Sequence, residues 1–142
     1  MSADCVFCRI VAGDAEASFV WRDAQTVAFM DLRQFSPGHT LVVPVKHVPD
    51  IFALDDETGA ALMSTVTRVA AAVRAAVGAE GINIWQSNGE GAGQEVFHLH
   101  VHVLPRRTDD GLLRVYPSSP GHPSRAELDK QAEAVRGVLE AG

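Results

Sequence analysis

The sequence lacks an excess of positive charge, because 18 Asp and Glu residues stand against 12 Lys and Arg and give a net charge of −6 at pH 7. A basic field is the usual footprint of a nucleic-acid-binding protein, so we expect no nucleic-acid partner. The sequence also lacks an uninterrupted apolar run of about 18 residues, which a membrane-spanning helix requires. Its first residues do not show the basic start and apolar stretch of a secretory signal. We therefore expect a cytoplasmic protein with no membrane partner.

Cysteine is scarce as well, since the chain has only two, Cys5 and Cys8. One pair so close in sequence cannot staple a domain of 142 residues. In a chain without an export signal, a Cys-x-x-Cys pair indicates metal ligands or a redox pair. The length suits one domain, 1–142, and 46% apolar against 21% charged residues is the balance of a globular protein.

Apolar periodicity and turn residues predict short strands around one long helix. The long helix is expected over Asp55–Val77, and a C-terminal helix over Ser124–Leu139. Between the last strand and that helix, residues 106–123 are expected to be irregular. The expected strands are Ser18–Trp21, Thr26–Asp31, Thr40–Val43, Ile82–Gln86 and Val96–Leu104. This order of elements predicts an α+β fold with a mainly antiparallel sheet.

The most informative segment is the expected strand Val96–Leu104, which carries His98, His100 and His102. Side chains alternate along a strand, so the three imidazoles share one face and the apolar residues share the other. A solvent-facing strand face without a special function is normally built from Thr, Ser, Lys or Glu, so three histidines on one face indicate a catalytic or metal-binding role. His98 and His102 would lie roughly 13 Å apart, too far for one zinc ion with bonds of about 2.0–2.1 Å to bind all three.

Further potential metal ligands lie upstream in the chain. Cys5 and Cys8 have the spacing of a zinc knuckle, and His39 and His47 flank the strand around Leu41–Val45. Two thiolates and two imidazoles would form a closed tetrahedral site of structural type. The spacing alone leaves a buried cysteine pair or a redox pair open.

These motifs resemble the histidine triad (HIT) family of nucleotide hydrolases and transferases, in its bacterial-type, zinc-containing branch. The segment His98–Leu104 matches the family signature of three His separated by single apolar residues and followed by two more. The resemblance extends over about 5–105, whereas residues 106–142 form a variable C-terminal segment. The other matching motifs are Cys5-Val6-Phe7-Cys8, Phe29-Met30-Asp31, Ser36-Pro37-Gly38-His39, Val43-Pro44-Val45-Lys46-His47 and Gly93-Gln94-Glu95-Val96.

The resemblance implies a HIT-like fold and a role for each matching residue. His100 would attack the α-phosphorus of a nucleotide and form a nucleotidyl-histidine intermediate that water hydrolyses, and a neutral imidazole is a competent nucleophile at pH 7. His39 and His102 would contact the phosphate and the leaving group. The other nucleotide contacts would be Asp31 at the ribose, Phe29 and Leu32 beside the base, and Asn88, Gly93, Gln94 and Glu95 near the phosphate.

The resemblance also implies a structural zinc ion bound by Cys5, Cys8, His47 and His98, and a homodimer formed through the long helix and the sheet edge. Glu95 is a departure from the pattern, since some family members have Ser at this place to assist the leaving group. A carboxylate there adds negative charge near a phosphate, which leaves open whether Glu95 touches the substrate.

The sequence therefore predicts an enzyme that cleaves the α-phosphate bond of a nucleotidyl conjugate and releases a nucleoside monophosphate, AMP. The conjugate would be an adenosine phosphoramidate or a diadenosine polyphosphate. Two alternatives stay open. One is a nucleotide-binding or sensing module with little turnover, and the other is a metalloenzyme in which His98 and His100 hold a catalytic metal.

Overall fold

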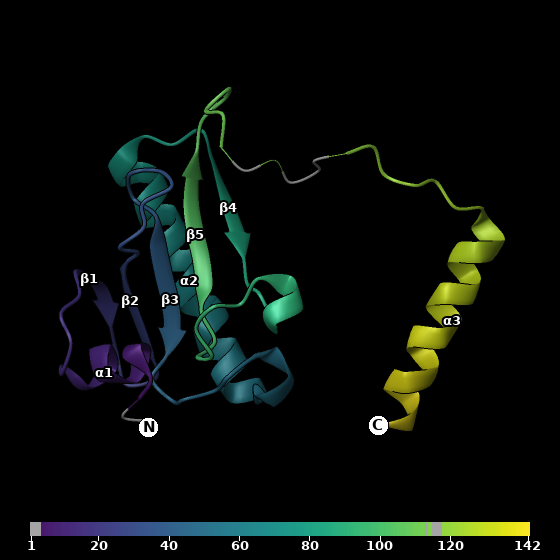
Figure 1. Ribbon diagram of the computed structural model, residues 1–142, viewed down its shortest axis with the longest axis horizontal. Coiled ribbons are helices and arrows are strands. Elements are labelled where there is room, and N and C mark those ends of the chain that lie inside the picture. Colours follow the sequence, from purple (N-terminus) through teal and green to yellow (C-terminus); the bar gives the residue numbers. More distant parts are fainter. Residues whose placement is uncertain (1–3, 113, 115–117) are drawn as a thin grey trace. The chain divides into compact units, whose positions relative to one another are not determined.

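The computed structural model describes residues 4–112, 114 and 118–142, and the chain divides into two compact units, Met1–Asp110 and Gly111–Gly142. The first unit contains a sheet with helix α2 (Asp56–Val77) on one face and the short helix α1 (Val6–Ala12) on the other (Figure 1). The second unit contains helix α3 (Arg125–Ala141). The expectation of one domain over 1–142 stays a prediction.

Five strands form the sheet in the order β1-β2-β3-β5-β4, and every neighbouring pair is antiparallel. The prediction of an α+β fold with a mainly antiparallel sheet and one long helix is therefore confirmed. The strands are β1 (Phe19–Arg22), β2 (Thr26–Met30), β3 (Thr40–Pro44), β4 (Gly81–Trp85) and β5 (Val101–Arg106). All the expected strands except the last begin and end within one residue of these bounds.

The two faces of the sheet have different partners, because side chains alternate along each strand. One apolar cluster joins α2 to Ala28, Val42 and Val103, and the other joins α1 to Val27, Phe29, Leu41 and Val43. On β5, His102 stands opposite Leu41 in the register of the sheet. This pairing places His102 on the α1 face, away from the core that α2 covers.

Helix α2 begins and ends where local sequence signals predict. The Asp55 side chain accepts a hydrogen bond from the backbone N–H of Thr58, and Gly78 ends the helix in the left-handed conformation with φ 61°. By length and composition alone α2 could cross a membrane. Its buried residues, Leu62, Thr65, Val66, Val69 and Val73, all face the interior of the first unit, as a core helix requires.

The second unit confirms the expected C-terminal helix. Ser124 accepts a hydrogen bond from the Glu127 N–H, and the Glu127 carboxylate accepts one from the Ser124 N–H, which together form a capping box. None of the residues of α3, all of which the structure describes, is buried. The described residues between β5 and α3 form no helix or strand.

The last strand differs from the prediction, since β5 begins at Val101 and not at Val96. The register that pairs Val101 with Val42 would bring Leu99 to Pro44, which has no N–H to donate. The Leu99 N–H instead donates to the Val48 carbonyl at 2.7 Å. His98 and His100 therefore precede the strand, and only His102 lies on it.

Pro105 does not end the strand, contrary to the sequence expectation. It lies inside β5 opposite Ile82, on the side of the sheet where β3 has not yet begun. Its neighbour there is Gly38, which adopts φ 103°. A proline is tolerated where no strand needs its missing N–H.

We predict that Gly38→Ala destabilises the protein by about 2–4 kcal/mol, because a Cβ would meet Val77 Cγ1 at 3.0 Å and Pro105 Cγ at 3.3 Å and would add the steric cost of positive φ. Gly13→Ala is the matched control, since Gly13 also has positive φ (87°) but nothing lies within 4 Å of its Cβ position. We expect it to cost only about 1–2 kcal/mol. Urea unfolding of both variants measures the difference, and equal losses would contradict the close approach.

Candidate active site and metal centre

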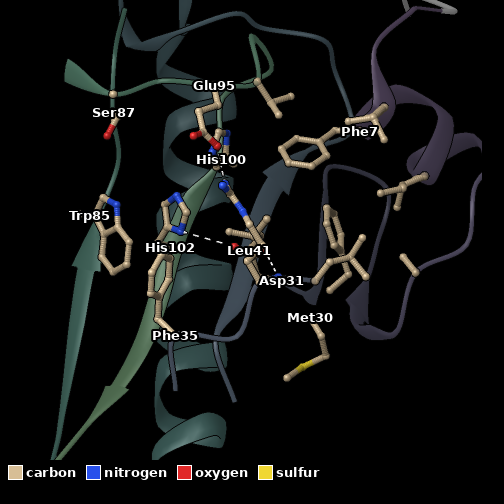
Figure 2. Close-up of a pocket in the computed structure, with 18 of the residues that line it drawn as sticks. Phe7, Met30, Asp31, Phe35, Leu41, Trp85, Ser87, Glu95, His100 and His102 are labelled. Atoms are coloured by element: carbon tan, nitrogen blue, oxygen red, sulfur yellow. Dashed lines mark hydrogen bonds and ion pairs between the residues drawn. The ribbon is translucent and has the colours of Figure 1, made fainter. Parts of the chain in front are cut away.

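A cavity of about 470 Å³ opens on the α1 face of the sheet (Figure 2). This volume is within the range of small-molecule sites. One part of its wall is apolar, and polar side chains converge on the rest. The apolar part includes Phe7, Ile10, Phe29, Leu41 and Val96, and the polar part includes Asp31, Arg33, Ser87, Glu95, His100 and His102.

His100 lines this cavity, and a hydrogen bond fixes the tautomer of its ring. Its Nδ1 lies 2.8 Å from the backbone carbonyl of His98, and a carbonyl can only accept, so Nδ1 carries the proton. The neutral ring then has its lone pair on Nε2. Burial lowers the pKa of His100, which keeps the imidazole neutral at pH 7. The arrangement gives a neutral imidazole a defined tautomer, as a histidine nucleophile requires.

His39 and His102 form a hydrogen-bonded pair beside His100. His39 is fully buried, and its Nδ1 donates to the Arg33 carbonyl at 3.1 Å, so its Nε2 accepts from His102 Nδ1 at 2.9 Å. The Asp31 carboxylate lies 3.6 Å from His39 Nε2 and 4.0 Å from His102 Nδ1. This chain of contacts leaves Nε2 of His102 as the nitrogen without an intramolecular role in this network.

The Trp85 indole stacks on the His102 ring, with centroids 4.3 Å apart and planes 4° from parallel. Sequence reasoning missed Trp85, because it lies on β4 and only the β4–β5 register places it opposite His102. Ser87, Arg33 and Phe35 are further lining residues that were not predicted. Their positions in the sequence could have indicated them. Ser87 and Arg33 follow predicted strands, and Phe35 precedes the predicted site residue His39.

Most of the predicted nucleotide contacts line the cavity, namely Phe29, Asp31, Leu32, Gly93 and Glu95. Asn88 and Gln94 are not among the lining residues. The Asn88 side-chain oxygen accepts from the Ile51 N–H at 2.7 Å. Gln94 is 4% exposed and donates to the Pro49 carbonyl at 2.6 Å. Both amides therefore hold loops together in this structure.

The glycine-rich loop has little to offer as a backbone donor at one of its ends. The Gly93 N–H donates to the Glu90 carbonyl at 2.9 Å, and the Gln94 N–H donates to the Gly89 carbonyl at 3.1 Å. Gly93 can therefore line the cavity, but its N–H is already used. The Gly93 and Gln94 N–H groups are therefore not free to bind an anion in this structure.

The four predicted metal ligands, Cys5, Cys8, His47 and His98, converge at a second place beside the cavity. Their donor atoms all lie within 4.8 Å of one another. Cys8 Sγ is 3.2 Å from His47 Nδ1 and 3.5 Å from His98 Nδ1, and the two Nδ1 atoms are 3.3 Å apart. His39 lies in the other cluster, with Asp31 and His102.

The donor set fits a tetrahedral zinc ion. Zinc bonds of about 2.3 Å to sulfur and 2.0–2.1 Å to nitrogen separate tetrahedral ligand atoms by roughly 3.3–3.8 Å, close to the distances observed. His98 Nε2 lies 2.8 Å from the Pro44 carbonyl and must donate to it, so Nδ1 has its lone pair toward the sulfurs. His100 is not a member of this cluster, which argues against a catalytic metal held by His98 and His100.

The fold places a cavity of small-molecule size beside an imidazole with a defined tautomer. The chain matches the family model of the HIT domain over residues 12–109, and it therefore belongs to the HIT family. The predicted family is confirmed. This chain is 37% identical over 120 residues to adenosine 5'-monophosphoramidase hnt1 of Schizosaccharomyces pombe, and the match covers 84% of this chain and 87% of that protein.

Solved structures agree with the fold. SMU.412c from Streptococcus mutans UA159 superposes with a TM-score of 0.92 at 37% identity, over 98% of this chain and 87% of that one. A Zn-bound histidine triad family protein from Mycobacterium smegmatis superposes with a TM-score of 0.74 at 38% identity, over 97% and 96% of the two chains.

We predict that protonation of His102 opposes folding at acid pH. Burial, with His100 and His39 nearby, lowers the pKa of His102 to about 4 from 6.5. Below about pH 6.5 this histidine binds a proton in the unfolded chain but not in the folded chain. The free energy of unfolding therefore decreases as the pH is lowered from about 6.5 to about 4. The slope from this group is at most about 1.4 kcal/mol per pH unit.

His102→Gln should therefore lose less stability than the wild type between about pH 6.5 and 4.5. The exposed His122→Gln is the control and should keep the wild-type slope. Unfolding free energies from urea titrations at a series of pH values measure all three slopes. Identical slopes would contradict a neutral, buried His102.

Proposed function

We propose that the protein is a nucleotide hydrolase or transferase that cleaves the α-phosphate bond of a nucleotidyl conjugate and releases a nucleoside monophosphate, AMP. The observation that carries the proposal is the tautomer of His100, whose Nδ1 proton is held by the His98 carbonyl in a ring that lines the cavity. The naming of the Schizosaccharomyces pombe relative as a monophosphoramidase supports the reaction class.

In the first step, His100 Nε2 forms a bond to the α-phosphorus and the bond from phosphorus to the leaving group breaks. The leaving group takes a proton, for which His102 Nε2 is the nearest candidate donor once its ring is protonated. Burial holds the pKa of His102 at about 4, so the protonated ring needs the Asp31 carboxylate within 4.0 Å and the negative charge of the bound phosphate. In the second step, water gives a proton to His102 Nε2 and its oxygen attacks the phosphorus, the P–N bond breaks, and the neutral His100 imidazole returns.

The remaining cavity wall suits the rest of a nucleotide. The phenyl rings of Phe7 and Phe29 are in edge contact, with centroids 5.4 Å apart, and offer an apolar surface to a base. Asp31 offers a carboxylate oxygen to the ribose hydroxyls. Its Oδ1 already accepts the Arg33 N–H at 2.9 Å, which orients the carboxylate.

Zinc is a further part of the proposal. Bound by Cys5, Cys8, His47 and His98, it would supply structural cross-linking, with no open position for a substrate. The ligands come from the N-cap and first turn of α1, from the segment after β3 and from the segment before β5. We also propose a homodimer and a cytoplasmic location, where the two thiols would stay reduced.

We predict that His100→Ala lowers the rate of hydrolysis of an adenosine phosphoramidate by at least about a thousandfold, because an attacking group is lost. AMP binding and the melting temperature should change little. AMP release measured by chromatography gives the rate, and calorimetry gives the affinity. A variant that retained more than about a hundredth of the wild-type rate would exclude covalent catalysis through His100.

The same measurements separate the enzyme from a sensing module. A module binds AMP and releases none from the phosphoramidate, whereas the enzyme does both. Restoration of the rate of His100→Gly by free imidazole would support the nucleophilic role directly.

We predict that Cys8→Ser releases zinc and lowers the melting temperature, but reduces the hydrolysis rate far less than His100→Ala does. The reason is that a closed four-ligand site contributes folding energy and not chemistry. Elemental analysis of the protein purified without chelator measures the metal. His98→Ala should resemble Cys8→Ser in zinc content, and a full equivalent of zinc in His98→Ala would remove His98 from the ligand set.

A further inference from the structure

The cavity carries a surplus of negative charge at a place where the proposed function puts a phosphate. Among the described residues that line it, Arg33 is the one Lys or Arg, against the carboxylates of Glu16, Asp31 and Glu95. Like charges without compensation would repel a phosphate monoester or diester. The position of Arg33 therefore decides whether the cavity can hold a nucleotide phosphate.

The backbone of Arg33 is fixed by two residues of the candidate site. Its N–H donates to Asp31 Oδ1 at 2.9 Å, and its carbonyl accepts from His39 Nδ1 at 3.1 Å. The guanidinium therefore leaves the loop from a fixed point next to the histidine pair.

Glu95 faces Arg33 from another loop that is equally well held. It follows Gln94, whose buried side chain donates to the carbonyls of Pro49 at 2.6 Å and Val96 at 3.1 Å. The carboxylate of Glu95 and the guanidinium of Arg33 form an ion pair. Glu95 and His100 both line the cavity and are labelled in Figure 2.

The ion pair contributes little to stability, since the two side chains are 67% and 64% exposed. Exposed pairs of this kind are worth about 0–1 kcal/mol. Both side chains also line the cavity, together with His100 and His102. The pair is therefore better placed to serve a ligand than the fold.

We propose that Arg33 is the cation that binds the phosphate of the nucleotide, and that Glu95 holds its guanidinium at the cavity until the ligand arrives. A guanidinium has five N–H donors in a planar fork, so it can bind a phosphate oxygen while it keeps or exchanges its contact with a carboxylate. The pairing also explains how a carboxylate at position 95 is compatible with a phosphate nearby. The inference rests on the proposed function for its ligand class.

Calorimetric titrations with AMP and with adenosine test the inference, because the two ligands differ by the phosphate alone. Arg33→Gln should bind AMP about tenfold or more weakly, the loss expected for a hydrogen bond to a charged group, while its affinity for adenosine stays the same. Glu95→Gln should bind AMP more tightly than the wild type, because removing a carboxylate that repels the phosphate and competes for the guanidinium outweighs losing the contact that holds Arg33. The double variant should bind AMP more tightly than Arg33→Gln, since no unpaired carboxylate then faces the phosphate.

Arg74→Gln is the matched control, because it removes the same charge from an exposed position on α2 outside the cavity. Its AMP affinity should equal that of the wild type. The deficit of Arg33→Gln should also shrink as salt is raised from about 0.01 M to 1 M, as expected for an exposed charge.

Equal losses for AMP and adenosine in Arg33→Gln would overturn the inference, since Arg33 would then only shape its loop. An unchanged affinity for AMP would overturn it as well. The proposed function fails separately if the wild type binds AMP but releases none from an adenosine phosphoramidate, and the Arg33 comparison is still decided in that case. A wild type that binds no AMP would overturn both.

Discussion

Both sites of this protein depend on the hydrogen bonds of one buried residue, His98. Its ring Nε2 donates to the Pro44 carbonyl, which turns Nδ1 toward the two thiols. Its own backbone carbonyl accepts the Nδ1 proton of His100, which leaves the lone pair on Nε2 of a ring that lines the cavity. The two histidines therefore belong to different sites. The tautomer of His98 is fixed by the Pro44 carbonyl, and the tautomer of His100 is fixed by the backbone carbonyl of His98.

The sheet separates stability from chemistry. The face toward α2 is filled by apolar side chains, whereas the face toward α1 combines an apolar cluster with the cavity and the metal ligands. His102 belongs to this second face because it stands opposite Leu41. A change in the core on the α2 side can therefore alter stability without touching a residue of the cavity, although the strands between them are shared.

Local signals in the sequence were sufficient for much of the fold. The ends of α2 follow from Asp55 and Gly78, which act within one turn of the helix. The start of β5 was mispredicted because it depends on Pro44, a residue of another strand. The resemblance pointed to the histidines and cysteines of both sites. It also placed Asn88 and Gln94 near the phosphate, whereas in the structure Asn88 accepts from the Ile51 N–H and Gln94 donates to the Pro49 carbonyl. Such contacts leave no periodic trace in the sequence.

The irregular segment between His98 and Val101 must keep its number of residues. Each residue of this segment makes a different contact. The His98 ring contacts the thiol of Cys8, the Leu99 N–H donates to the Val48 carbonyl, and the His100 ring lines the cavity. Inserting or deleting one residue would exchange these groups, so that an imidazole would turn to the apolar core and both sites would be lost together. Substitutions at single positions are tolerable to different degrees, but the spacing is not free to vary.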